Sequence, residues 1–238
     1  MRDIFVGELV GTFLLILFGS SICANVNMSK SGMHGAGPIV ITIGWGFAVM
    51  VPAFCFGAMS GASFNPALTI ALALKGDVMW NTVPIYIIAQ LLGAILGASL
   101  TWALFKDHFD AKGESPEAIR GCFCTAPTIP NTLRNLLSEI VGTFVLCFTI
   151  FAMSAVPQAS ESGVDKLFTY SIIVLIGMSF GGLTGYAINP ARDLGPRIAY
   201  TILPFKNKTD SNWAYAWIPV VGPIIGAIIA VGLYSIVF

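Results

Sequence analysis

The tripeptide Asn-Pro-Ala occurs twice in this chain, at Asn65-Pro66-Ala67 and at Asn189-Pro190-Ala191. Each copy follows a glycine-rich run and opens an apolar stretch, residues 66–74 or 190–200, of about half the length needed to cross a bilayer. Proline is tolerated in the first turn of a helix and asparagine is a good N-cap, so each tripeptide predicts the start of a short helix. Irregular backbone at membrane depth is tolerated only where protein buries it or where it lines a water-filled cavity.

The rest of the chain has the composition of a membrane protein. Of its 238 residues 56% are hydrophobic and 10% are charged, whereas a soluble domain carries about 25% charged residues. Six apolar stretches approach the roughly 20 residues that a spanning helix needs. They are residues 4–24, 38–57, 83–105, 136–155, 167–180 with its neighbours, and 214–238. The chain is therefore predicted to be an all-α integral membrane protein, and its formal net charge of zero, with no basic stripe, argues against a nucleic-acid partner.

The two halves of the chain repeat the same order of features. Residues 8–13, Glu-Leu-Val-Gly-Thr-Phe, correspond to residues 139–144, Glu-Ile-Val-Gly-Thr-Phe, and residues 90–95 correspond to 223–228. Each half holds three spans, an odd number, so the second copy must enter the membrane inverted. The short helices then approach from opposite faces and meet at the midplane. Residues 1–238 are predicted to form one domain, with repeat halves of about 1–105 and 134–238 joined by a loop over residues 106–133.

These motifs resemble the aquaporin superfamily, and specifically its glycerol facilitators. The resemblance covers nearly the whole chain and rests on residues 60–69 and 181–193, which look like the two pore loops of that family. Arg192 and Asp193 follow the second tripeptide, and an aspartate there resembles the glycerol-conducting branch. The resemblance implies a right-handed bundle of six transmembrane helices plus two re-entrant half-helices in an inverted internal repeat. It also implies one pore per subunit, a homotetramer, and a multi-pass location in the cell membrane.

The resemblance further implies a selectivity filter, whose members are found by counting from the tripeptides. They are Trp45, Gly177, Tyr186 and Arg192. Water-selective members usually have histidine at the position of Gly177, and glycine is expected to leave room beside Arg192. Glycerol facilitators more usually have phenylalanine at the position of Tyr186, so the solute range stays open.

A polyol has a carbon face and a hydroxyl face, which an aromatic corner opposite an arginine would match. Arg192 would donate to solute hydroxyls, and the amides of Asn65 and Asn189 would donate at the pore centre. The acceptors would be the backbone carbonyls of Gly61, Ala62, Ser63, Phe64, Gly185, Tyr186, Ala187 and Ile188. Two helix N-termini at the pore centre, together with Arg192, are predicted to exclude cations and protons.

Two carboxylates, Glu8 and Glu139, lie well inside predicted spans. An intramembrane acid is often functional, for example in a proton relay. Their symmetric placement instead favours a scaffold role, in which each accepts hydrogen bonds from the N–H groups of the re-entrant loop in its own half. Asp193 is expected to order the second loop by pairing with Arg197, which lies four residues further on. No catalytic residue, cofactor or metal is expected, and the spacing of Cys122 and Cys124 is wrong for the usual zinc pairs.

The predicted function is a passive channel, and not an enzyme, for glycerol and similar small neutral solutes. Water would be a co-permeant, and ions and protons would be excluded. A mainly water-selective channel is one alternative, and a proton-coupled secondary transporter that uses Glu8 and Glu139 is another. A structural role that joins two membranes finds little support in the charged loop over residues 106–135.

The distribution of basic residues disagrees with the orientation that the resemblance implies. With the N-terminus inside the cell, the cytoplasmic segments hold Arg2, Lys75 and Lys166. The outer loops hold Lys30, Lys106, Lys112, Arg120, Arg134, Lys206 and Lys208. An excess of lysine and arginine normally lies in the cytoplasm, so this statistical rule alone would invert the protein. We prefer the orientation of the family, and the conflict stays open.

Overall fold

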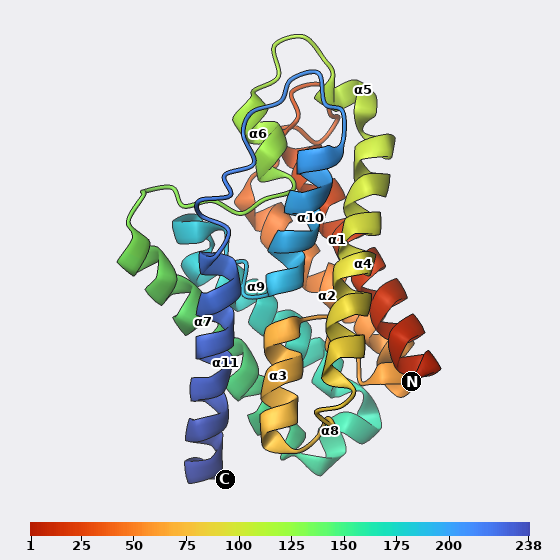
Figure 1. Ribbon diagram of the computed structural model, residues 1–238, viewed down its shortest axis with the longest axis vertical. Coiled ribbons are helices and arrows are strands. Elements are labelled where there is room, and N and C mark those ends of the chain that lie inside the picture. Colours follow the sequence, from red (N-terminus) through yellow and green to blue (C-terminus); the bar gives the residue numbers. More distant parts are fainter.

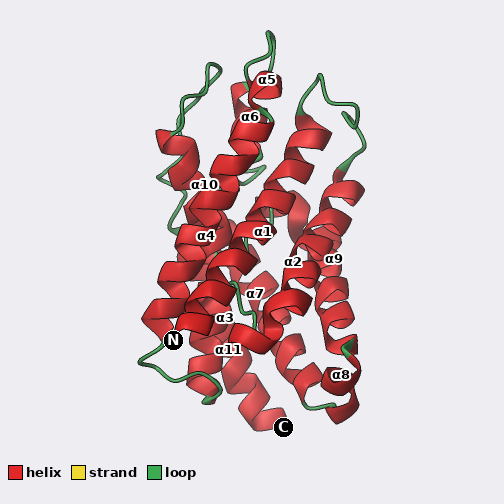
Figure 2. Ribbon diagram, turned by 90° about the vertical axis from the view of Figure 1, so that its right-hand side faces the viewer, coloured by secondary structure: helices red, strands yellow, loops and turns green.

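The computed structural model is entirely helical over the residues that it describes, which are the backbone of residues 1–238 and all side chains except those of Pro157 and Ser160. Six helices are long and apolar enough to cross a membrane, which confirms the predicted spans. They are α1 (Arg2–Asn27), α2 (Pro38–Ser60), α4 (Val83–Leu104), α7 (Thr132–Ser154), α9 (Val164–Thr184) and α11 (Ile218–Val237). They run side by side with loops at both ends (Figure 2). The chain is thus a multi-pass membrane protein.

The two half-helices begin at the predicted residues. They are α3 (Pro66–Lys75) and α10 (Pro190–Ile202), which end one and two residues beyond the predicted ends. Figure 1 shows α10 in the upper half of the molecule and α3 in the lower half, with both chain termini at the lower end. Termini on one side are what an even number of spans requires.

Glycine lets the outer helices of each half approach closely. Helix α1 packs mainly on α4, and a Cβ atom added to Gly93 would lie 2.3 Å from the carbonyl oxygen of Leu9. Helix α7 packs mainly on α11, and a Cβ atom added to Gly226 would lie 2.2 Å from the carbonyl oxygen of Ile140. The two contacts occupy corresponding positions in the repeat. Small residues at helix contacts in membranes permit this close backbone approach.

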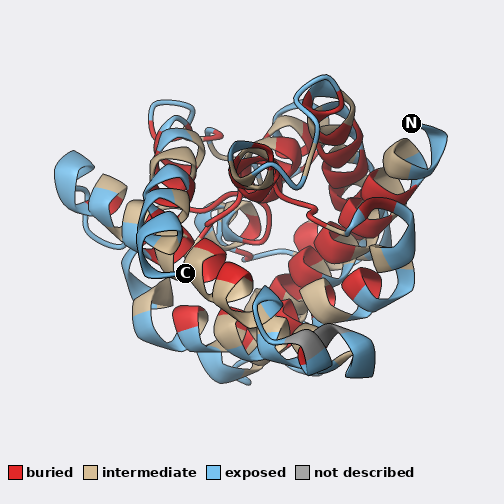
Figure 3. Cartoon of the chain, turned by 90° about the horizontal axis from the view of Figure 1, so that it is seen from below, coloured by how far each residue is buried: buried red, intermediate tan, exposed pale blue. Residues whose placement is uncertain are grey.

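The two halves are interlocked by their half-helices. Helix α10 packs mainly on α4 of the first half, and α3 packs mainly on α11 of the second. A Cβ atom added to Gly195 would lie 2.4 Å from the Cβ of Ala94, so α10 and α4 are in close contact. Seen along the bundle, the buried parts of the chain gather around its centre and the exposed parts lie on the outside (Figure 3). Any passage through this centre is therefore built by both repeats.

The segment that connects the two halves, residues 106–133, was predicted to be a loop but contains short helices. It contains the short helices α5 (Lys106–Phe109) and α6 (Pro116–Gly121), and a third short helix, α8 (Pro157–Ser162), joins α7 to α9. Helix α6 begins at Pro116 because Ser115 caps it, accepting a hydrogen bond from the N–H of Ala118 at 3.2 Å. These short helices lack the long apolar stretch by which a membrane-spanning helix is recognised from sequence.

An aromatic cluster anchors the connecting segment over the end of α10. The ring of Phe123 lies 5.3 Å from that of Phe205, and the ring of Tyr200 lies 4.9 Å from that of Phe205, between centroids. Cys122 and Cys124 are buried beside this cluster, and burial raises the pKa of the Cys124 thiol to about 12. A thiol that stays protonated is a poor nucleophile, and we interpret this buried pair as loop packing.

Candidate functional site

The loops that precede α3 and α10 share an unusual backbone conformation. Ala62 and Phe64 have φ of 54° and 46°, and Tyr186 and Ile188, at the corresponding positions, have φ of 37° and 44°. The left-handed region costs a non-glycine residue about 1–2 kcal/mol. Other contacts must therefore hold both loops in place.

Glu8 holds the first loop. Its carboxylate is completely buried and accepts hydrogen bonds from the N–H groups of Ser63 at 3.1 Å and Phe64 at 2.8 Å. It also accepts from the hydroxyl of Ser60 at 2.6 Å and from Nε2 of Gln90 at 2.7 Å. The buried charge is stabilised by these donors.

Glu139 holds the second loop in the same way. It is completely buried and accepts from the N–H groups of Ala187 at 3.0 Å and Ile188 at 2.8 Å, and from the hydroxyl of Thr184 at 2.7 Å. The backbone contacts of both glutamates were expected from the sequence, whereas their side-chain donors were not. One signal was available, because a hydroxyl residue, Ser60 or Thr184, precedes the first glycine of each loop.

The two asparagines cap the half-helices and cross-link the loops. The side-chain oxygen of Asn65 accepts from the N–H of Ala67 at 2.9 Å, and that of Asn189 accepts from the N–H of Ala191 at 3.0 Å. Nδ2 of Asn65 donates to the carbonyl of Ile188, and Nδ2 of Asn189 donates to the carbonyl of Phe64, both at 2.8 Å. Each amide donates one of its two N–H groups in these cross-links.

These cross-links use two of the carbonyls that were expected to accept from solute. The carbonyls of Phe64 and Ile188 each accept from an asparagine of the other repeat, which leaves one lone pair on each oxygen. The side chain of Phe64 is buried against α1, where a Cβ atom on Gly11 would lie 2.0 Å from its ring. Each loop therefore uses one carbonyl to join the repeats.

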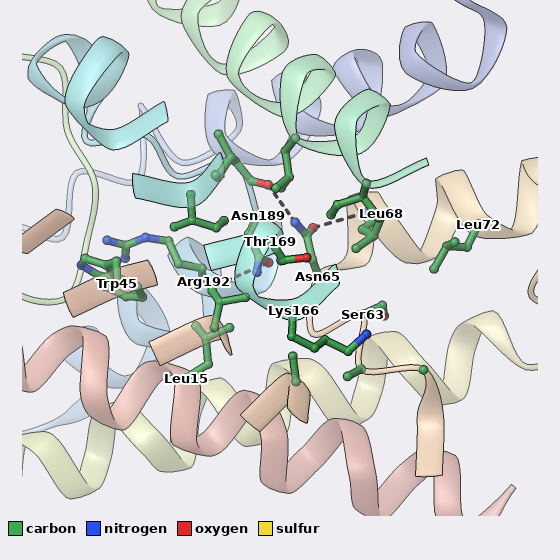
Figure 4. A pocket seen from close by; sticks show the side chains of 18 of the residues that line it. Leu15, Trp45, Ser63, Asn65, Leu68, Leu72, Lys166, Thr169, Asn189 and Arg192 are labelled. Atoms are coloured by element: carbon green, nitrogen blue, oxygen red, sulfur yellow. Dashed lines mark hydrogen bonds between the residues drawn. The ribbon is translucent and has the colours of Figure 1, made fainter. Parts of the chain in front are cut away.

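A cavity of about 250 Å³ runs past these loops. Figure 4 shows Trp45 and Arg192 toward one end, Asn65 and Asn189 in the middle, and Leu72 toward the other end. The predicted residues that line it are Trp45, Gly61, Ala62, Ser63, Asn65, Tyr186, Ala187, Ile188, Asn189 and Arg192. Apolar side chains also line the cavity, among them Leu15, Val49, Leu68, Leu146, Ile150 and Ile173. Phe64, Gly177 and Gly185 are not among the lining residues.

Arg192 and Trp45 meet at one end of the cavity. The guanidinium carbon lies 4.0 Å from the centroid of the indole ring, which is a cation–π contact. The guanidinium makes no hydrogen bond to any residue that the structure describes, although Arg192 is only 9% exposed. Its five donors are thus available inside the cavity.

The second arginine of α10 is the opposite case. Arg197 is completely buried and donates from Nε to Asp193 at 2.8 Å and from Nη2 to Asp193 at 2.8 Å. It also donates to the carbonyls of Thr125 at 2.9 Å and Asn212 at 3.1 Å. The predicted pairing of Asp193 with Arg197 is present, and Asp193 further accepts from the N–H of Thr125 at 2.8 Å. This arginine is saturated by protein groups, whereas Arg192 is free for a ligand.

The position of Gly177 differs from expectation. Glycine was expected to leave open space beside Arg192, but a Cβ atom there would lie 2.0 Å from Cγ2 of Thr42 and 2.9 Å from Cζ of Tyr186. A Cβ atom on Gly181, one turn further along α9, would lie 2.9 Å from the same ring. Thr42 and Tyr186 therefore fill the space beside Gly177. Gly177 packs behind the ring of Tyr186 and does not itself line the cavity.

The comparisons with known proteins agree with this geometry. The family model described as major intrinsic protein matches residues 2–234. The chain is 50% identical over 234 residues to the glycerol uptake facilitator protein of Bacillus subtilis, covering 98% of this chain and 84% of that protein. It is 50% identical over 236 residues to the glycerol uptake facilitator protein of Streptococcus pneumoniae, covering 99% of both chains. The crystal structure of the aquaglyceroporin from Plasmodium falciparum superposes with a TM-score of 0.83 at 30% identity, covering 99% of this chain and 96% of that one.

Proposed function

The chain belongs to the major intrinsic protein family, and on that premise we propose that it is a passive membrane channel for glycerol and other small uncharged solutes. Water passes through the same pore, and ions and protons are excluded. The selectivity filter is formed by Trp45, Tyr186 and Arg192, with Gly177 behind it. The pore lies within one chain, and we propose that four chains assemble as a homotetramer in the bilayer.

One observation carries this proposal, which is that two chemically different kinds of group line the cavity. Residues of both loops and the unpaired donors of Arg192 supply polar groups, and aliphatic side chains supply apolar surface. A polyol also has a hydroxyl face and a carbon face. It exchanges water hydrogen bonds for protein hydrogen bonds in such a passage at little net cost, whereas an ion loses its hydration against a positive barrier.

The printed names of the relatives support glycerol in particular. The proteins at 50% identity are glycerol uptake facilitators, and the structural neighbour is an aquaglyceroporin. A mainly water-selective channel fits less well, because neither the filter nor the residues behind it include the histidine typical of such channels.

A proton-coupled transporter needs carboxylates that meet the solute path. Glu8 and Glu139 are completely buried, lie outside the lining of the cavity, and accept several hydrogen bonds each. Their contacts favour the scaffold role over a proton relay.

Purified protein in lipid vesicles is expected to accelerate reswelling in an inward glycerol gradient, measured by stopped-flow light scattering against empty vesicles. The acceleration should persist after an uncoupler collapses any proton gradient, since no step is coupled to protons. Reswelling no faster than through lipid alone would overturn the proposal. Dependence on the proton gradient would favour the transporter instead.

Replacing Arg192 with valine is expected to raise the proton or cation leak on the order of tenfold or more. The substitution removes a full positive charge from a narrow, weakly hydrated passage, and each 1.4 kcal/mol off a barrier is a factor of ten. The measurement is the decay of a pH gradient across vesicles, read from an enclosed dye. Arg134→Val is the matched control, because Arg134 is exposed on the outer end of α7 and does not line the cavity. An unchanged leak in Arg192→Val would contradict its electrostatic role.

A further inference from the structure

The indole of Trp45 packs on two residues of α1 that do not line the cavity. A Cβ atom added to Gly19 would lie 2.2 Å from Cζ3 and 2.3 Å from Cη2 of the ring, so the ring sits directly on the glycine backbone. Cys23 lies one turn further along α1, and its sulfur accepts a hydrogen bond from Nε1 of Trp45 at 3.4 Å. Gly19 sets how deep the ring lies, and Cys23 fixes its rotation.

The other side of the same ring faces the cavity. Arg192 lies over the indole at 4.0 Å, and Trp45 is 3% exposed. The ring is therefore held between the α1 backbone and the guanidinium. Protein interiors are close-packed, so volume added on the α1 side moves the ring toward Arg192, and volume removed there lets the ring retreat.

We propose that Gly19 and Cys23 form a seat for Trp45 that sets the width of the passage between Trp45 and Arg192, and thereby the largest polyol that passes. They are specificity-determining positioning residues. The identity of the solutes rests on the proposed function, but the seat itself rests only on the packing of α1 against Trp45.

Substitutions at Gly19 and at Cys23 are expected to change the width of the passage in opposite directions. Gly19→Ala pushes the ring into the passage, and we expect glycerol permeability to fall on the order of tenfold, the usual effect of one methyl group in a fitted site, while water permeability falls less. Cys23→Ala removes the sulfur behind the ring together with the hydrogen-bond acceptor. We expect the permeability of a four-carbon polyol, relative to glycerol, to rise several-fold, again the effect of one small group in a fitted site. Cys23→Ser keeps a polar atom near Nε1 and should stay close to the unmodified protein.

The experiment compares water, glycerol and erythritol permeabilities in vesicles, normalised to the amount of folded protein. Gly232→Ala on α11 is the control, because a Cβ atom there meets no atom within 4 Å. A merely structural role would lower all three permeabilities together in Gly19→Ala and in Cys23→Ala. That result, or no change in either variant, would contradict the proposed role of Gly19 and Cys23.

A failure of the proposed function looks different. An unmodified protein that conducts water but not glycerol would refute the proposed solute, yet Gly19→Ala should still lower water permeability and Cys23→Ala should still raise it. Structures of the two variants give a readout without transport. The distance from the Arg192 guanidinium to the Trp45 ring should fall below 4.0 Å in Gly19→Ala and rise above it in Cys23→Ala. An unchanged distance in both variants would also contradict the proposed role of Gly19 and Cys23.

Discussion

Asp193→Ala is expected to destabilise the folded channel by about 3–5 kcal/mol, which is the cost of removing one partner of a buried ion pair. Both oxygens of Asp193 bind the guanidinium of Arg197, and both residues are completely buried. Without the carboxylate, the charge of Arg197 has no counterion, and the N–H of Thr125 loses its acceptor at 2.8 Å. The second loop and the connecting segment would lose their shared anchor.

The measurement is the apparent unfolding temperature in detergent, together with the yield of monodisperse protein. Asp77→Ala is the matched control, since the Lys75–Asp77 pair at the end of α3 is partly exposed to solvent and should contribute at most about 1 kcal/mol. A double variant, Asp193→Leu with Arg197→Met, replaces both charges by apolar groups and should recover much of the stability. Unfolding of Asp193→Ala at the temperature of the unmodified protein would contradict the anchoring role.

The elements of this fold that were predicted correctly are those that local chemistry determines. Each long span carries enough apolar residues to be recognised alone, and both half-helices begin where an asparagine cap meets proline in the first turn. The pairing of Asp193 with Arg197 follows from helical spacing. The function follows because two tripeptides in inverted repeats are a specific signal, and the family relationship confirms it.

Other features depend on contacts between distant segments and could not be found from sequence. Alanine, phenylalanine, tyrosine and isoleucine disfavour positive φ, yet Ala62, Phe64, Tyr186 and Ile188 adopt it because buried carboxylates bind the neighbouring N–H groups.

The surroundings of the filter are a second case. Counting from the tripeptides found its aromatic residues, but that Gly19 lies under Trp45 is a matter of helix packing that no spacing rule gives. Counting along the sequence thus selected residues that line the cavity, whereas the residues packed behind them are visible only in the structure.

Gly177→His is expected to reduce glycerol permeability by more than about tenfold, with a smaller loss for water. The first atom of the new side chain would already lie 2.0 Å from Thr42 and 2.9 Å from Tyr186, so both must move to admit the imidazole. Tyr186 lines the cavity, and its displacement narrows the passage beside Arg192. One added or missing group in a fitted site changes the discrimination between substrates about 10–200-fold. We therefore expect the larger loss of permeability for glycerol, which is wider than water.

Neighbouring glycines on α9 supply a graded series for this prediction. A Cβ atom on Gly181 would meet the Tyr186 ring at 2.9 Å, whereas one on Gly182 meets nothing within 4 Å. Gly181→Ala should therefore lower glycerol permeability several-fold, as a smaller intrusion on the same ring, and Gly182→Ala should leave it unchanged. Stopped-flow light scattering on vesicles with glycerol and with an impermeant osmolyte separates the two permeabilities. Equal losses of glycerol and water in Gly177→His, or a loss in Gly182→Ala as large as in Gly181→Ala, would mean that Gly177 and Gly181 do not act through Tyr186.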